Sequence, residues 1–284
     1  MSAKIIDGKL VAQKIKDSLR AETEELKKAG KVPGLAVIIV GDNPASRVYV
    51  NSKKKSCGEV GFYSEEITLP GDSSQEQLLE IINHLNQRSD INGILVQLPL
   101  PRHFNEELVL NSISPLKDVD CFHPVNVGKL MIGSPDFIPC TPGGVMELIK
   151  ETGITVAGKE CVVVGRSNIV GKPQAMLLLA ESGTVTVCHS KTRDLREVCK
   201  RADILVAAVG KAKMITADMV KEGAVVIDVG INRMEDKKLC GDVDYDSVSQ
   251  VAGYITPVPG GVGPMTIAML MKNTLKAFKL QNNK

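Results

Sequence analysis

The sequence predicts an α/β fold with two domains. Short apolar runs that end in Gly or Pro alternate with amphipathic stretches of helical spacing, a pattern typical of parallel strands joined by crossover helices. The length of 284 residues exceeds that of most single domains, and a hydrophobic fraction of 43% supplies apolar material for two cores. We therefore expect two sheets, each with its own helices.

The predicted elements alternate along the chain. Strands are expected at residues 35–41, 93–100, 161–165, 184–189, 203–210, 224–230 and 254–260. Helices are expected at residues 8–29, 45–60, 74–87, 143–152, 172–182 and 264–279. Because the strand candidates are continuously apolar, both faces of their sheets should be covered.

The domain border is predicted near Cys140. The stretch from Ser112 to Gly144 is rich in Pro and Gly, which predicts an irregular connection. We expect one domain over residues 1–140 and a second over residues 141–263. The last helix contains the apolar run MTIAMLM, so we expect residues 264–284 to return to the first domain.

Composition and charge argue against several classes of protein. The 35 basic and 33 acidic side chains leave a formal charge of +2, which argues against a nucleic-acid partner. The seven cysteines form no Cys-x-x-Cys pair, which favours a reducing compartment without disulfides or zinc. The first residues have no signal-peptide core and no long apolar run occurs, so we expect a cytoplasmic protein that does not cross a membrane.

Residues 161–183 combine an apolar strand, a glycine turn and an amphipathic helix. Such a turn presents backbone N–H groups and a helix N-terminus to phosphate, as in Rossmann-like domains. Gly165 and Gly171 frame the turn, but Ser167 stands at the second glycine of the usual G-x-G-x-x-G pattern. The turn predicts a dinucleotide site, and the alternative is a tight connection that needs glycine only for its dihedral angles.

The end of the next strand favours one dinucleotide over the other. NAD sites usually carry an acidic residue there, whereas residues 188–193 read Cys-His-Ser-Lys-Thr-Arg. With Arg166, these polar and basic groups suit the 2′-phosphate of NADP. We therefore expect NADP, although Lys191 and Arg193 equally fit a solvated loop.

The strand at residues 224–230 ends at the same predicted sheet edge. Ile231 is placed to line a nicotinamide pocket there. Asp228 either contributes to the site or accepts hydrogen bonds from loop backbone.

One helix stripe carries a candidate for proton transfer, Lys53. Burial and the charges of two neighbouring lysines should lower its pKa toward a useful value. The alternative is a lysine that extends along the stripe to water. Helical spacing aligns Ser46, Tyr49, Val50, Lys53 and Cys57, while Lys54 and Lys55 point elsewhere.

Three loops and strands add further candidates. Gln97 is an amide inside an apolar strand, where it needs hydrogen-bond partners. Asp118, Asp120 and His123 share a loop that suits a polar heterocycle better than a metal, because no second His or Glu stands at ligand spacing. The glycine-rich loop at residues 256–266 either lets backbone approach a flat ligand closely or is simply a bent connection.

Jointly, these segments resemble the methylenetetrahydrofolate dehydrogenase/cyclohydrolase family. The matches in chain order are PASRVYVNSKKK, VQLPLP, KDVDCFHP, TPGGV, GRSNIVGKP, DVGINR and TPVPGGVGPMT. The resemblance implies an N-terminal α/β catalytic domain that binds folate and a Rossmann-like, parallel-sheet domain that binds NADP. It implies Lys53 as the catalytic lysine, Gln97 as its partner, Tyr49 as the ring against the folate, Asp120 as the pterin anchor, Pro259 and Gly263 as residues that flank the folate, and Gly165, Arg166, Ser167, Ser190 and Ile231 as dinucleotide positions.

One position departs from the family pattern. Cys121 stands where the family usually has glycine between Asp120 and Phe122. If this position requires a positive φ, the side chain costs on the order of 1 kcal/mol and shifts Asp120.

The resemblance also implies an activity. A homodimer would oxidise 5,10-methylenetetrahydrofolate with NADP and hydrolyse the methenyl product to 10-formyltetrahydrofolate, within one-carbon metabolism. The alternatives are another two-domain NAD(P)-dependent dehydrogenase with a small polar substrate and a dinucleotide-binding protein without catalysis. The combination of Tyr49, Lys53, Gln97 and Asp120 favours the folate enzyme over both.

Overall fold

The computed structural model describes residues 2–235 and 238–282, and the chain divides into two compact units. The three-stranded unit comprises Gln13–Cys140 and Ile267–Lys284. The six-stranded unit comprises Met1–Ala12 and Thr141–Thr266. The first residues group with the six-stranded unit because a short N-terminal strand extends its sheet, which differs from the boundary expected from the sequence.

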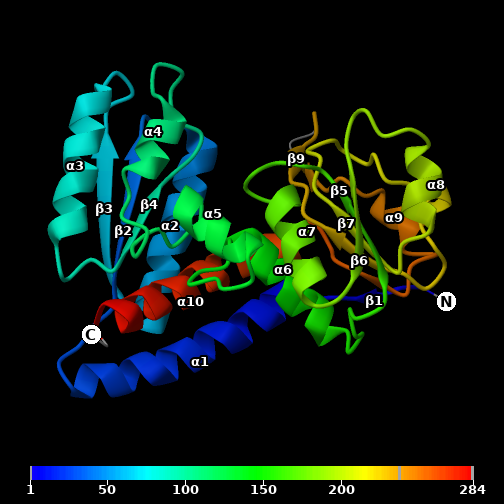
Figure 1. Cartoon of the computed structure of the whole chain (residues 1–284), viewed down its shortest axis with the longest axis horizontal. Helices are drawn as coiled ribbons and strands as arrows, with labels where there is room; N and C mark the ends of the chain where they lie inside the picture. The colour runs from blue at the N-terminus through cyan, green and yellow to red at the C-terminus, as the bar shows by residue number, and fades with distance from the viewer. Residues whose placement is uncertain (1, 236–237, 283–284) are drawn as a thin grey trace. The chain divides into compact units, whose positions relative to one another are not determined.

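The three-stranded unit is built on a parallel sheet with the order β3-β2-β4 (Figure 1). Its elements are α1 (Gly8–Lys28), β2 (Gly34–Val40), α2 (Pro44–Val60), β3 (Tyr63–Leu69), α3 (Gln75–Gln87), β4 (Gly93–Val96), α4 (Glu106–Asn111), α5 (Pro124–Met131) and α10 (Val262–Asn282), with the unit boundary inside α1 and α10.

Both faces of this sheet are covered, because every residue of β2 is buried. On one face, alternate residues of β2 and β4 pack with α3 and α4. On the other face, Leu35, Val37 and Leu95 pack with α1, α2 and α10. The result is a three-layer α/β/α arrangement with two cores.

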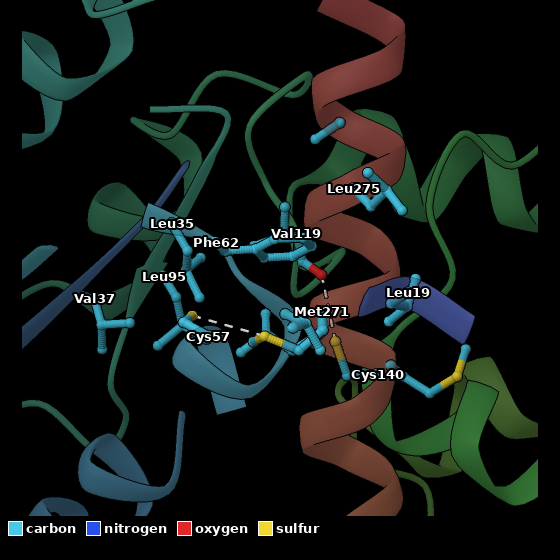
Figure 2. Packing of buried hydrophobic residues seen from close by; sticks show 14 of the residues in the cluster. Leu19, Leu35, Val37, Cys57, Phe62, Leu95, Val119, Cys140, Met271 and Leu275 are labelled. Carbon is cyan, nitrogen blue, oxygen red and sulfur yellow. Dashed lines mark hydrogen bonds between the residues drawn. The ribbon is translucent and has the colours of Figure 1, made fainter. Parts of the chain in front are cut away.

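Helix α10 supplies much of the second core. Figure 2 shows Met271 and Leu275 of α10 among side chains from α1, α2 and the sheet. The Cys57 and Met271 sulfur atoms lie 3.7 Å apart, which joins residues 214 positions apart in the chain. The expected return of the C-terminal helix to the first domain is therefore confirmed.

The main sheet of the six-stranded unit has the strand order β1-β11-β8-β7-β5-β6, with all of its strand pairs parallel, and a separate two-stranded sheet, β10-β9, is antiparallel. Its elements are β1 (Lys4–Ile5), α6 (Cys140–Glu151), β5 (Glu160–Val164), α7 (Gly171–Ala180), β6 (Thr184–Cys188), α8 (Leu195–Lys200), β7 (Ile204–Ala207), η1 (Ala217–Met219), β8 (Val225–Asp228), β9 (Asn232–Arg233), β10 (Leu239–Cys240), α9 (Tyr245–Val248) and β11 (Tyr254–Ile255).

The strand order places a topological switch point beside β5. The chain moves from β5 outward to β6 and then crosses back to β7 on the other side of β5. Open parallel sheets bind ligands at the carboxyl ends of the strands that flank such a point. The expected Rossmann-like architecture is confirmed, and it directs attention to the loops that follow β5, β6, β7 and β8.

All seven predicted strands and six predicted helices occur, with ends that differ by up to three residues, except that β4 and β11 end four and five residues earlier than predicted. The stretch from Ser112 to Gly144 is more regular than expected, because it contains α5 and the first turn of α6. Helix α5 begins with Pro124 in its first turn and His123 as its N-cap, a start signal that the Pro-rich composition obscured. None of the described helices is long and apolar enough to span a lipid bilayer.

Candidate active site

Helix α2 holds the predicted stripe on its inner face. Asn43 precedes the helix, and its side chain accepts a hydrogen bond from the Ser46 backbone N–H at 3.2 Å, which satisfies one donor of the first turn. Lys53 is only 8% exposed, whereas Tyr49, one turn earlier, is 37% exposed. The expectation of a buried lysine on this stripe is confirmed, and the alternative of a lysine that reaches water is wrong.

The Lys53 ammonium group is held by the amide of Gln97. Lys53 Nζ donates to Gln97 Oε1 at 2.9 Å, and Gln97 Nε2 donates to the Leu98 carbonyl at 2.7 Å. Because the Gln97 backbone N–H is bonded to the Ile38 carbonyl, the glutamine is anchored at the end of the sheet. Gln97 therefore presents its oxygen to the lysine in a fixed orientation.

Burial and two acidic groups determine the charge state of this lysine. Burial lowers the pKa of Lys53, while neighbouring Asp120 and Cys140 raise it. Burial raises the pKa of Asp120, and the Lys53 charge opposes that change. The two expected neighbouring lysines are not among these causes, since Lys54 and Lys55 lie at the surface beside Glu66 and Glu59.

The loop that carries Asp120 is fixed by the other aspartate of the same motif. Asp118 is buried, and its carboxylate accepts hydrogen bonds from the Phe122 and His123 backbone N–H groups at 3.1 and 2.9 Å and from Asn126 Nδ2 at 2.8 Å. His123 Nδ1 accepts from the Val125 N–H at 3.1 Å and so caps α5. Asp118 and His123 are thus structural, and Asp120 alone of the three interacts with Lys53.

Cys121 has a backbone conformation that favours glycine, the residue that the family usually has at this position. Its φ is +62°, in the left-handed region, and its side chain is completely buried. The thiol donates to the Phe137 carbonyl at 3.3 Å. The condition under which the cysteine side chain was expected to cause strain is therefore met, and the thiol occupies part of the core.

The turn after β5 has no room for side chains at its two glycines. Gly165 has a φ of +131°, and a Cβ there would lie 2.1 Å from the Ala208 carbonyl oxygen. A Cβ on Gly171 would lie 2.2 Å from the Gly165 carbonyl oxygen. Ser167 Oγ accepts from the Val170 and Gly171 N–H groups at 3.2 and 3.3 Å, so its hydroxyl caps the start of α7. Close packing at the switch point explains both glycines.

The other predicted dinucleotide residues lie on loops at the carboxyl edge of the same sheet. Arg166 and Ser190 are exposed, which leaves their polar groups accessible to a ligand. Ile231 is 47% exposed, and its Cδ1 would lie 3.8 Å from a Cβ at Gly263. The structure therefore brings Ile231 and Gly263 together within this unit, while Pro259 is exposed nearby in the chain.

Asp228 is fully engaged with backbone. It is buried and accepts hydrogen bonds from three backbone N–H groups, so the alternative of a structural carboxylate is confirmed. Burial raises the pKa of Asp228 to about 6, although the three backbone donors oppose this change. The sequence did not identify two further residues that interact with these sites: Asp242, which binds the loop after β7, and Cys140, which affects the pKa of Lys53. The partners of both residues are distant in sequence.

Together, the parallel sheet with its glycine turn and the buried lysine with its amide partner define a two-domain, dinucleotide-dependent enzyme. Residues 6–120 match the family "Tetrahydrofolate dehydrogenase/cyclohydrolase, catalytic domain", and residues 139–282 match the family's "NAD(P)-binding domain". The chain belongs to the tetrahydrofolate dehydrogenase/cyclohydrolase family.

Individual relatives agree over nearly their full length. The "Bifunctional protein FolD" of Acetivibrio thermocellus is 68% identical over 281 residues, which cover 99% of both chains. The crystal structure of FolD from Campylobacter jejuni is 51% identical, with a TM-score of 0.96 and coverage of 98% of this chain and 99% of that one. The Trypanosoma brucei enzyme, solved with NADP and an inhibitor, is 42% identical, with a TM-score of 0.95 and coverage of 99% and 98%.

Proposed function

We propose that this chain oxidises 5,10-methylenetetrahydrofolate with NADP and hydrolyses the 5,10-methenyl product to 10-formyltetrahydrofolate, with Lys53 as the proton-transfer residue of the second reaction. The observation that carries this proposal is the buried Lys53 amine, which is hydrogen-bonded to Gln97 and whose pKa the negative charge of Asp120 raises. The relatives from Acetivibrio thermocellus and Campylobacter jejuni, which match along nearly the whole chain, are both described as bifunctional.

The first reaction removes a hydride from the one-carbon bridge and leaves a cation that the two flanking nitrogens stabilise. No general base is needed, so positioning is the task of the protein. Asp120 is proposed to anchor the pterin, and Tyr49 is proposed to lie against the folate ring. The partial exposure of Tyr49 beside the buried Lys53 supports this role, because its ring offers a face to a ligand.

The second reaction adds water to the methenyl carbon and then breaks the bond from this carbon to N5. Both protons must leave the water oxygen, which becomes the formyl oxygen: N5 gains one of them, and the other is released to solvent with the positive charge of the methenyl cation. A neutral amine at Lys53 can accept a proton from the water oxygen and, as an ammonium group, donate it to N5. Burial supports this role because it lowers the lysine pKa, while Gln97 keeps the amine in one orientation.

The residues of the six-stranded unit fit a dinucleotide phosphate. Because only glycine fits at positions 165 and 171, the turn can fold tightly against the Ala208 carbonyl and against itself, and it leads directly into the N-terminus of α7, where backbone N–H groups suit a phosphate. We propose that Ser167, Arg166 and Ser190 bind the phosphates, including the 2′-phosphate of NADP, and that Ile231 contacts the nicotinamide. When bound, NADP accepts the hydride.

We also propose that the chain acts as a cytoplasmic homodimer. All seven cysteines are unpaired, and six of them are buried, which suits a reducing compartment. Strand β3 forms one edge of its three-stranded sheet, and an unpaired edge of this kind is open to a second copy. The mass in solution, measured by light scattering, tests the dimer directly.

The function is tested by replacing Lys53 with methionine. Lys53→Met removes the amine but keeps much of the buried volume, so methenyl hydrolysis should fall by at least about 10²-fold while part of the hydride transfer remains. A spectrophotometric assay that follows methenyl formation and its decay, with NADP and NAD in turn, measures both reactions.

The matched control is Lys54→Met, since Lys54 is the next residue and its side chain is exposed. We expect this variant to retain both activities within about twofold. Full retention of hydrolysis in Lys53→Met would remove the lysine from the mechanism. A parent enzyme that oxidises no methylenetetrahydrofolate, or that prefers NAD, would contradict the assignment of substrate or cofactor.

A further inference from the structure

Two buried carboxylates link the loops at the carboxyl edge of the six-stranded sheet. Asp228, the last residue of β8, is 3% exposed, and Asp242, which follows β10, is completely buried. A buried carboxylate is stable only where donors surround it. Both residues meet this condition through hydrogen bonds to segments far apart in the chain.

Asp228 holds the two segments beside β8. Its Oδ1 accepts from the Gly230 and Asp242 backbone N–H groups, both at 2.9 Å, and its Oδ2 accepts from the Val243 N–H at 2.9 Å. The Asp228 N–H in turn donates to Thr256 Oγ1 at 2.7 Å, beyond β11. This carboxylate therefore seats Asp242 against the end of β8.

Asp242 extends this connection to the end of β7. Its Oδ2 accepts from the Val209 and Gly210 backbone N–H groups at 2.6 and 2.9 Å, and its Oδ1 accepts from Asn232 Nδ2 at 2.9 Å. Two successive backbone donors that converge on one oxygen fix the direction of the loop after β7. That loop leaves the sheet next to the switch point, where Ala208 packs on Gly165.

The two aspartates bind the residues on either side of Ile231 in the sequence. The residue before it, Gly230, is bound by Asp228, and the residue after it, Asn232, is bound by Asp242. Space is equally restricted: a Cβ on Gly230 would lie 2.2 Å from Asp242 Oδ1, and one on Gly241 would lie 1.7 Å from Asp228 Oδ2. The glycines thus leave room for Asp228 to bind the Gly230 backbone before Ile231 and for Asp242 to bind the Asn232 side chain after it.

We infer that Asp242, seated by Asp228, is a positioning residue for hydride transfer. Through the Asn232 side chain and the Val209 and Gly210 N–H groups, it holds the segment around Ile231 and the loop after β7 in the one arrangement that orients the nicotinamide ring. This inference rests on the proposed NADP-dependent oxidation. Because hydride transfer depends steeply on the distance and angle of the reacting carbons, a loosened ring lowers kcat even where the phosphates remain bound.

The test is Asp242→Asn, which preserves size but replaces one acceptor oxygen with an NH₂ group. The single amide oxygen can accept from at most two of the three donors, and the negative charge that strengthens all three hydrogen bonds is lost. We expect the dehydrogenase kcat to fall about tenfold or more, while the Kd for NADP, measured by calorimetry, changes by less than about threefold because the glycine turn is intact. With methylenetetrahydrofolate deuterated on its one-carbon bridge, the isotope effect on kcat should increase.

Two measurements separate positioning from a general loss of structure. Methenyl hydrolysis without NADP depends on the proposed Lys53 site in the other unit, so it should stay within about twofold of the parent. The control Asp203→Asn removes a carboxylate at the opposite end of β7, where it accepts from the Glu160 N–H at 2.9 Å and Lys221 Nζ at 2.7 Å. This control should leave both activities and the isotope effect unchanged.

The inference fails if Asp242→Asn loses both activities in parallel with its thermal stability, or keeps the parental kcat and isotope effect. If Asp242→Asn does not fold, Asn232→Ala tests the same contact more gently, and an unchanged isotope effect in that variant contradicts the inference equally. A parent that oxidises no methylenetetrahydrofolate with NADP contradicts the proposed function instead.

Discussion

Two lysines of the three-stranded unit are buried to the same degree, but their partners differ. Lys117 is 7% exposed, and its Nζ donates to the Leu85 and Arg88 carbonyls at 2.9 and 2.5 Å, where it caps the end of α3. Lys53 donates to the side chain of Gln97. Burial lowers the pKa of both lysines. The partners of Lys117 are helix carbonyls, which identifies it as a structural residue.

The pH dependence of hydrolysis should follow the pKa of Lys53. The active form in our proposal is the neutral amine, so the rate should rise with pH through that pKa, which burial places below its usual value of 10.5. Gln97→Glu puts a carboxylate against the amine, stabilises the ammonium form and raises the pKa. The profile of hydrolysis kcat against pH should therefore move to higher pH in Gln97→Glu.

The neutral variant Gln97→Met is the control for this experiment, since it removes the hydrogen bond without adding charge. Its profile should not move to higher pH. A Gln97→Glu profile that stays in place or moves to lower pH would exclude Lys53 as the titrating group.

Cys121 allows a second prediction for a single residue. At a φ of +62°, Cys121→Gly relieves strain of about 1 kcal/mol that Cys121→Ala retains. The glycine variant should therefore unfold with a free energy at least equal to that of the alanine variant, measured in urea. At Cys57, which is equally buried but lies within α2, the order should reverse, with glycine less stable than alanine by about 1 kcal/mol.

At the scale of elements, the turn from β5 to α7 restricts the residue at position 165 to glycine by steric contact as well as by backbone angle. Gly165→Ala places a Cβ against the Ala208 carbonyl and should lower the free energy of unfolding by about 3 kcal/mol or more. Gly223→Ala also requires a positive φ, +79°, but meets no atom within 4 Å, so it should cost about 1 kcal/mol. Equal losses in urea denaturation would show that contact contributes nothing.

The elements predicted from the sequence were those with strong periodicity. The strands β2, β4 and β7 are apolar throughout, and β5 and β8 are apolar except for one acidic residue at an end, so their apolar runs identified them. Strand β3 has the sequence YSEEITL and was missed because its two glutamates interrupt any apolar run. Such residues are tolerated there because β3 is a partly exposed edge strand. Its position is set by pairing with β2, which only the folded chain supplies.

The candidate site divides in the same way. Gln97 could be found because it is an amide in an otherwise apolar run, and Tyr49 and Lys53 because helical spacing places them on one stripe of α2. Asp242 could not, since its donors at Val209 and Gly210 lie more than thirty positions away and are backbone groups without a sequence signal. The structural role of Asp118 was also hidden, because its donors at Phe122 and His123 are backbone groups without a sequence signal, even though they are close in sequence.

For the whole molecule, the three-stranded unit depends on a distant segment of the chain. Asn273 of α10 donates to the Val119 and Ile138 carbonyls, both at 2.8 Å, and Gln281 Nε2 donates to the Asn92 and Leu116 carbonyls at 2.8 and 2.9 Å. These bonds satisfy carbonyl groups of loops in the first segment. The last helix therefore completes both the core and the backbone hydrogen bonding of this unit.

This dependence predicts a large effect near the end of the sequence. Leu275 is 2% exposed, so Leu275→Ala should lower the free energy of unfolding by about 2–5 kcal/mol. Its neighbour Lys276 is solvent-exposed, and Lys276→Ala should change it by less than about 0.5 kcal/mol. Thermal denaturation of the two variants makes the comparison, and a small effect at Leu275 would mean that α10 is dispensable for the core.

The discontinuous make-up of the two units has a consequence during synthesis. The six-stranded unit has all of its segments once residue 266 has emerged from the ribosome, whereas the three-stranded unit still waits for residues 267–282. The unit that carries most of the early sequence is thus the later one to close. Until then its nascent chain exposes the apolar positions that α10 will cover, so we expect ribosome-associated chaperones to bind this part of the protein for longest.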